Sequence, residues 1–184
     1  MKKSTIVAVC MLAAVGLRFS PVLAAEPALM EEEVQEFVWE DIEEVVNEAD
    51  IPGEFVELAE PMVKFFLPEI LEGEELTEEE QEEGLLGVYL DEEGEASVII
   101  TYLDMLCEDV YEYGDFIEEE YDTEVEYLRV NGMDAICYYV EEDDELCVAF
   151  VPEEDYVLEF AFCPMEDEAF YSLTQLMTAS IQKL

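Results

Sequence analysis

The sequence predicts an α+β fold in which an antiparallel sheet of about six to eight strands is flanked by helices. Several short segments rich in β-branched and aromatic residues are separated by turn residues, a pattern typical of consecutive antiparallel strands. Other segments repeat apolar residues every three or four positions, which is typical of amphipathic helices. The chain is 52% hydrophobic, so it can bury a core although 31% of its residues are charged.

Residues 1–24 have the layout of a secretory signal peptide. Lys2 and Lys3 precede an apolar run at residues 6–17, and the small side chain of Ala24 predicts cleavage directly after it. The run is shorter than the roughly 20 residues that cross a bilayer, and no later segment is long enough. We therefore expect a secreted or periplasmic protein without a membrane span.

The remaining residues are predicted to form an acidic amphipathic helix within 25–50 and a single α+β domain over 51–184. The helix is predicted from about residue 30, and its apolar residues recur at helical spacing: Met30, Val34, Val38, Ile42, Val45 and Ala49. Pro52 and Gly53 should end it.

The first half of the domain is predicted to contain two hairpins and two helices. Strands at 55–58 and 62–67 form a hairpin at the edge of a sheet, and Thr77 and Glu80 fit a capping box that starts a short surface helix. A second hairpin pairs 85–90 with 96–102. A helix follows over 106–121, although Gly114 weakens it by about 1 kcal/mol relative to alanine.

The second half is predicted to contain four strands and a last helix. The strands occupy 123–130, 133–140, 146–151 and 156–163, and Asn131-Gly132 gives the first pair a type I′ turn. From residue 166 to the end, apolar residues recur at helical spacing, so the chain should finish on a helix that packs against the sheet.

Alternation along these strands predicts one sheet face with small side chains and one with bulky side chains. Small side chains would let a helix approach closely, so either the last helix or the helix at 106–121 should lie over that face. The predicted small face contains Ala135, Cys137, Cys147, Ala149, Ala161 and Cys163. The predicted bulky face contains Leu146, Val148, Phe150, Leu158, Phe160 and Phe162.

Charge narrows the range of partners. The chain has 51 acidic and 6 basic residues, and its net charge is −45. Such a field repels nucleic acids and anionic lipids and attracts divalent cations and basic protein surfaces. Nucleic-acid binding is therefore excluded, while general solubility stays open as an alternative reason for the charge.

Four cysteines follow the predicted signal: Cys107, Cys137, Cys147 and Cys163. An even number in an oxidising compartment permits two disulfides, and Cys137 with Cys147 is one candidate pair on adjacent strands. Buried free thiols are the equal alternative. No Cys-x-x-Cys element is present, so the sequence gives no indication of a zinc site and no other cofactor is expected.

Two acidic loops are candidates for calcium, because calcium takes carboxylate and carbonyl oxygens. Their carboxylates are Asp91, Glu92 and Glu93 in one loop and Glu141, Glu142, Asp143 and Asp144 in the other. Neither loop has the spacing of an EF-hand.

Catalysis has little support in the sequence. The chain has no histidine, which excludes the usual histidine-assisted serine or cysteine hydrolases. With 51 carboxylates, two side chains at the separation found in glycosidases are expected by chance. We therefore expect a non-enzymatic protein and keep a carboxylate-dependent hydrolase as a second alternative.

Three segments resemble PsbP-like domains of small secreted bacterial proteins. These are Val130-Asn131-Gly132-Met133 with Ala135 and Tyr138, the strand at 157–164, and a helix ending near Ser180-Ile181. The resemblance extends in element order over 55–181. It implies an antiparallel sheet with helices on both sides and a non-catalytic binding or assembly module, and it carries over no functional residue. An exported binding or protein-interaction module is the leading hypothesis, and a calcium-binding protein is the first alternative.

Overall fold

The computed structural model describes residues 34–184. Its larger sheet has eight strands in the spatial order β1 (Gln35–Phe37), β7 (Val125–Val130), β8 (Met133–Val140), β9 (Glu145–Glu153), β10 (Tyr156–Cys163), β6 (Ser97–Asp104), β5 (Leu85–Asp91) and β4 (Leu71–Gly73). A smaller sheet has the order β11 (Gln182–Lys183), β3 (Val63–Pro68) and β2 (Gly53–Leu58). The helices are α2 (Trp39–Ala49), α3 (Glu78–Glu82), α4 (Val110–Tyr121) and α5 (Glu168–Ser180). The predicted signal peptide, 1–24, lies outside the described residues.

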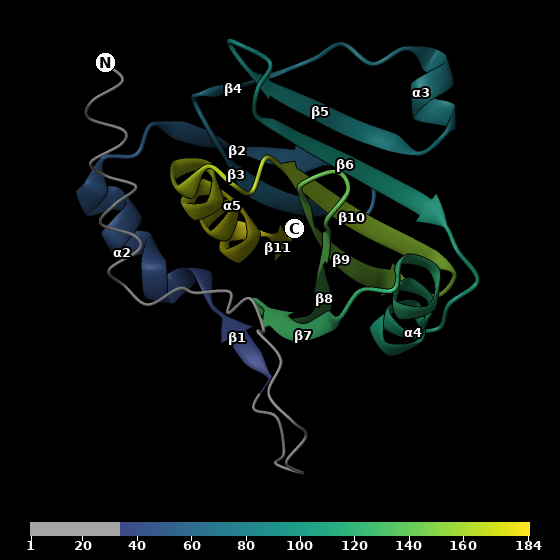
Figure 1. Cartoon of the computed structure of the whole chain (residues 1–184). Helices are drawn as coiled ribbons and strands as arrows, with labels where there is room; N and C mark the ends of the chain where they lie inside the picture. The colour runs from purple at the N-terminus through teal and green to yellow at the C-terminus, as the bar shows by residue number, and fades with distance from the viewer. Residues whose placement is uncertain (1–33) are drawn as a thin grey trace.

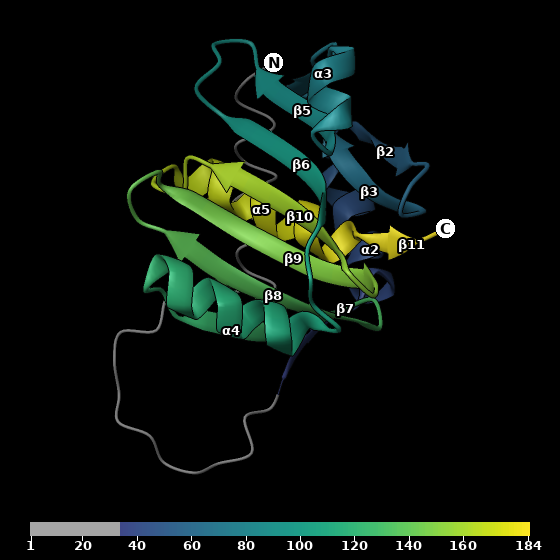
Figure 2. The ribbon, with the colours of Figure 1, turned by 90° about the vertical axis from the view of Figure 1, so that its right-hand side faces the viewer.

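The larger sheet has a different cover on each face. Helix α5 and the smaller sheet lie on one face, and α4 lies on the other (Figures 1 and 2). The main core lies on the α5 face and contains the fully buried rings of Phe65, Phe160 and Phe162. A second apolar cluster lies between α4 and the sheet, and includes Ile117 and Ile136. The α+β class and the strand number are thus as predicted.

Local signals placed most of the strands correctly. Asn131 and Gly132 have φ of 48° and 80°, as a type I′ turn requires, and they join β7 to β8. Thr77 and Glu80 form the predicted capping box at the start of α3. Helix α4 begins at Val110, four residues later than predicted, because the Asp109 side chain accepts hydrogen bonds from the amides of the first turn.

The N-terminal helix is shorter than predicted. It begins at Trp39, and β1 precedes it and pairs in parallel with β7, so the larger sheet is mixed rather than wholly antiparallel. The side chain of Asn131 accepts a hydrogen bond from the Trp39 amide and fixes the start of α2. Trp39, Ile42 and Val46 are buried, so the helix docks on the domain. Residues 25–33 lie outside the described part.

The first predicted hairpin forms, and it lies in a separate sheet. Strands β2 and β3 do pair, but they belong to the smaller sheet rather than to the edge of the larger one. Two residues at the C-terminus complete that sheet: Gln182 and Lys183 pair with β3, so the chain ends on a strand and not on a helix. Helix α5 stops at Ser180 because Ile181 takes an extended conformation.

The predicted division of the sheet faces was wrong for β8. Cys137 is paired with Val148, and Tyr138 with Cys147, so Ala135 and Cys137 lie on the bulky, α5-facing side. The small side chains of Cys147, Ala149 and Ala161 do share the other face, and α4 covers it. The register between β8 and β9 could not be read from the alternation of each strand alone.

Candidate functional site

Glu159 is the one carboxylate on β10 that faces the α4 side of the sheet. Its neighbours across the strands are Ala149 on β9 and Thr101 on β6. Two tyrosine hydroxyls donate to the same oxygen, Oε2: Tyr113 of α4 at 3.0 Å and Tyr138 of β8 at 2.5 Å. No described residue donates a hydrogen bond to the other oxygen, Oε1. The carboxylate is therefore held in place with half of its acceptor capacity unused.

Burial decides the electrostatics of this carboxylate. Desolvation raises the pKa of Glu159, and the hydrogen bonds from Tyr138 and Tyr113 offset part of that rise. Desolvation and the nearby Glu159 charge together raise the pKa of both tyrosine hydroxyls, which stay protonated as donors. Within residues 34–184, Arg129 forms an ion pair with Asp134, and no lysine or arginine side chain pairs with Glu159.

Cys147 and Glu145 extend the polar cluster along β9. The Cys147 thiol donates to Glu145 Oε1 at 3.4 Å, and burial followed by the Glu159 charge raises its pKa. Burial also raises the pKa of Glu145. A hydrolytic pair needs one carboxyl with a raised pKa beside one that stays ionised. The pKa values of Glu145 and Glu159 are both raised, so these shifts give the hypothesis of a carboxylate-dependent hydrolase no support.

Aromatic rings surround the Glu159 cluster. The Phe116 ring stacks on Tyr113 with centroids 6.1 Å apart, and the Tyr121 ring stacks on Tyr138 at 6.3 Å. Phe116 is 44% exposed and Tyr121 is 53% exposed. The two tyrosines that hold the carboxylate therefore connect it to aromatic surface in contact with solvent.

Beside this cluster, part of the sheet face is covered by no helix of residues 34–184. Helix α4 packs on β7, β8 and β9 and shares a buried cluster with Val157 and Ala161 of β10, whereas the same face continues over β6 and β5 (Figure 2). Helix α3 lies near β5, but it buries none of its own side chains. We name the uncovered residues the open strip. They are Val88, Leu90, Ile99, Thr101 and Leu103, all partly exposed and brought to one face by the β5–β6 and β6–β10 registers.

The structure places the two predicted calcium loops at separate hairpin ends. Asp91 Oδ1 accepts hydrogen bonds from the amides of Glu95 and Ala96, and Asp144 accepts from the Tyr139 hydroxyl and the Met165 amide. Among the described residues, no three acidic or cysteine side chains lie close enough to hold a metal ion. Glu92, Glu93, Glu141, Glu142 and Asp143 thus gather no metal site around these two carboxylates.

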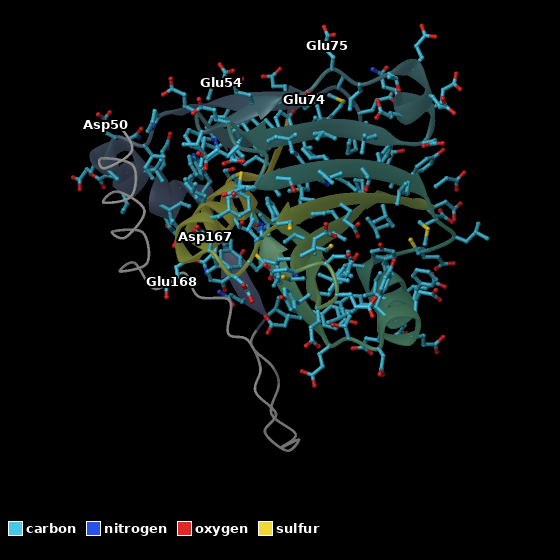
Figure 3. The ribbon with its side chains drawn as sticks, turned by 45° about the horizontal axis from the view of Figure 1, so that its top comes forward. Asp50, Glu54, Glu74, Glu75, Asp167 and Glu168 are labelled. Carbon is cyan, nitrogen blue, oxygen red and sulfur yellow. The ribbon has the colours of Figure 1, made fainter. Side chains whose placement is uncertain are left out.

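Carboxylates elsewhere are distributed over the surface. Figure 3 shows Asp50 at the end of α2, Glu54 on β2, and Glu74 and Glu75 in the segment after β4, with their side chains at the edge of the molecule. Lys64 and Lys183 lie in the smaller sheet, on the opposite side from the open strip. Exposed carboxylates lie at the ends of β5 and β6, and neither strand has a lysine or arginine, so the open strip is bordered by acidic side chains: Glu92, Glu93, Glu95 and Asp104.

The four cysteines are free thiols. Cys137 and Cys147 lie on adjacent strands but point to opposite faces, so the candidate disulfide between them is wrong. Cys107 is buried and Cys163 is partly exposed.

Comparison with known proteins identifies the fold. Neither a protein-family model nor a curated protein sequence matches the chain. The solution structure of cyanobacterial PsbP from Synechocystis sp. PCC 6803 matches with a TM-score of 0.52 and 13% identity, over 73% of this chain and 94% of that one. The chain has a PsbP-like fold. The Saccharomyces cerevisiae Ran-binding protein Mog1p matches with a TM-score of 0.42 and 14% identity, over 73% of this chain and 96% of that one.

Sequence analysis anticipated the PsbP-like fold but missed the Glu159 cluster. One signal was available: Glu159 is a single carboxylate within the otherwise apolar run Val157 to Phe162. A charge at an inward position of a strand needs partners, and those partners came from α4 and β8, far away in the sequence.

None of the helices in residues 34–184 has the length and apolar character that crossing a bilayer requires.

Proposed function

We propose that this chain is an exported, non-catalytic interaction module that binds a partner with a basic surface through the open strip. The observation that carries the proposal is the set of partly exposed apolar side chains on β5 and β6. Contiguous apolar surface in a folded protein favours contact with another molecule. The acidic surface around it favours a basic partner and opposes a second copy of the same chain.

The dimensions of the open strip favour a helix as the docking element. Strands lie about 4.8 Å apart, so the open strip on β5 and β6, together with the bordering strand β10 that carries Glu159, spans roughly 10 Å between the outer two strands. A helix with its side chains is about 10–12 Å across. The neighbouring three strands are already covered by one helix, α4. A partner helix with one apolar and one basic face would complete this layer beside α4.

A model peptide tests the proposal. The probe is a helical peptide of leucine, lysine and alanine with all leucines on one face, and its control is a scrambled peptide of the same composition and charge. Both are titrated into the ¹⁵N-labelled chain. We expect the amphipathic peptide to shift the amide resonances of Val88, Ile99 and Leu103 with saturation, and the scrambled peptide to bind at least roughly tenfold more weakly. Raising salt should weaken binding without abolishing it.

Two results would overturn the proposal. Equal binding of both peptides would mean that charge alone attracts them and that the open strip is not a docking surface. Shifts of these resonances with protein concentration alone would mean that a second copy occupies the strip. The double variant Val88→Thr with Ile99→Thr serves as a control, because it reduces the apolar area of the open strip and keeps β-branched residues. It should bind the amphipathic peptide more weakly than the wild-type chain does, while the strands stay folded.

A further inference from the structure

Glu159 differs from the many surface carboxylates because its position is fixed. The two tyrosine hydroxyls come from a helix and from a neighbouring strand, and both bind Oε2. Tyr113 and Tyr138 are themselves buried, with exposed fractions of 4% and 5%. Side chains this well packed leave the carboxylate little freedom, so its free oxygen is presented at a defined point of the sheet.

That point lies at the border between α4 and the open strip. Glu159 is directly opposite Thr101, which belongs to the open strip. On its other side it is opposite Ala149, which lies under α4. A helix packed on the open strip beside α4 would therefore pass next to this carboxylate.

The surroundings suit a cation and lack one. Phe116 and Tyr121 add exposed aromatic rings beside the two buried tyrosines. Aromatic faces attract ammonium and guanidinium groups, and a carboxylate forms charge-assisted hydrogen bonds with them. The basic residues of the described chain are elsewhere, because Arg129 pairs with Asp134 on β7 and β8 and the two lysines lie in the smaller sheet.

We propose that Glu159 is the specificity-determining anchor of the docking surface, and that its Oε1 accepts a hydrogen bond from a lysine or arginine side chain of the partner. This inference rests on the proposed function, because it requires a partner on the open strip. It adds one positional requirement: a single cationic side chain matters more than the rest. The general acidic charge of the chain, by contrast, attracts every positive charge of the partner to a similar extent, whatever its position.

The test combines a peptide series with two variants. Each lysine of the amphipathic peptide is replaced in turn by norleucine, which keeps most of the chain length and removes the charge. Every peptide is titrated into the wild-type chain, Glu159→Gln and Glu57→Gln. Glu57 lies on β2 of the smaller sheet and is exposed, so Glu57→Gln removes one charge away from the site. Glu159→Gln keeps an oxygen that can accept the tyrosine hydroxyls.

We expect one lysine position to stand out. Its replacement should weaken binding to the wild-type chain and to Glu57→Gln by about tenfold, the size of one charge-assisted hydrogen bond, and to Glu159→Gln by less than about twofold. Replacement of a lysine at any other position should weaken binding of the peptide to all three proteins by a similar factor. If every lysine contributes equally in the wild-type chain, or if Glu159→Gln keeps the full positional effect, Glu159 is not the anchor. The proposed function would still hold after that result if the unsubstituted peptide shifts the open-strip resonances. If those resonances do not move, the proposed function itself is wrong.

Discussion

The side-chain amide of Asn131 donates a hydrogen bond to the carbonyl oxygen of Ile181 at 2.7 Å, across 50 positions of sequence. The same nitrogen donates to Ala179 O at 2.9 Å, and Asn131 Oδ1 accepts from the Trp39 amide at 2.7 Å. One turn residue thus connects the start of α2, the β7–β8 turn and the end of α5. Asn131 therefore forms the β7–β8 turn through its backbone and stabilises the tertiary structure through its side chain.

Replacing Asn131 with glycine should cost stability although the turn geometry is kept. Glycine accepts the positive φ, but three hydrogen bonds are lost and buried backbone groups lose their partners. We expect the free energy of unfolding to fall by about 2–4 kcal/mol in urea denaturation. Gly132→Asn is the matched control, because no atom lies within 4 Å of the added Cβ and asparagine tolerates this conformation. A loss for Asn131→Gly no larger than that of the control would contradict the role given to these bonds.

Removing one tyrosine hydroxyl from the Glu159 cluster should destabilise the fold. Tyr138→Phe leaves the ring in place and takes one donor from a carboxylate that is largely shielded from water. The expected loss is about 1–3 kcal/mol of unfolding free energy. Tyr111→Phe is the control, since Tyr111 is 51% exposed, and its effect should stay within about 0.5 kcal/mol. Equal effects of the two substitutions would show that the hydroxyl of Tyr138 does not stabilise the carboxylate.

The pH dependence of stability should report on Glu159. Burial raises its pKa above the ordinary value of 4.5, and it does the same for Glu126 and Glu145. The folded state therefore binds more protons than the unfolded state just above pH 4.5, and the stabilisation present below that pH is lost as the pH rises through the raised pKa values. Melting temperatures of the wild-type chain should fall from acidic toward neutral pH, with a shallower fall for Glu159→Gln.

Asp91 supplies a control of opposite sign. A hydrogen bond from the Ala96 amide lowers its pKa, so its stabilisation is present at neutral pH and is lost as the pH falls. Asp91→Asn should therefore lower the melting temperature more at neutral pH than in acid. If Glu159→Gln and the wild-type chain have parallel pH profiles, the Glu159 carboxyl titrates normally and its burial has no energetic consequence.

Thiol reactivity should separate the cysteines by position. Cys137 and Cys147 are buried, and desolvation raises the pKa of both thiols. Cys163 is partly exposed at the end of β10. Limited alkylation of the native chain with iodoacetamide, followed by peptide mass spectrometry, should modify Cys163 first and the three buried thiols, those of Cys107, Cys137 and Cys147, only as the fold opens. Early modification of Cys147 would indicate that α4 does not protect it, and denatured protein provides the control in which all sites react.

Predictions from the sequence succeeded where the signal was local. Asn131-Gly132, the Thr77–Glu80 capping box and the alternation of β9 and β10 each depend on residues close together in the chain. They identified the strands and the fold class. Pairing between distant segments was not accessible, because periodicity does not specify the partner strand: β1 next to β7 and β11 next to β3 are both such pairs.

The candidate site was largely hidden for the same reason. In the sequence Glu159 is one carboxylate among 51. Its distinct environment depends on the hydroxyls of Tyr113 and Tyr138, which lie 46 and 21 positions away. The open strip depends on where α4 lies across the sheet, which is a tertiary relationship. The acidic loops were predicted as calcium candidates because their carboxylates are adjacent in sequence. In the structure Asp91 accepts hydrogen bonds within its own turn, and Asp144 accepts from Tyr139 and from the distant Met165 amide.

The larger sheet ends at both edges in a strand of only three residues, β1 on one side and β4 on the other. A long unpaired edge is a template on which another polypeptide can add a strand through its backbone, whatever its side chains are. Terminal strands this short offer few free backbone groups for such growth. Association through the larger sheet is thereby favoured at its faces, through side-chain contacts where sequence-specific discrimination is possible.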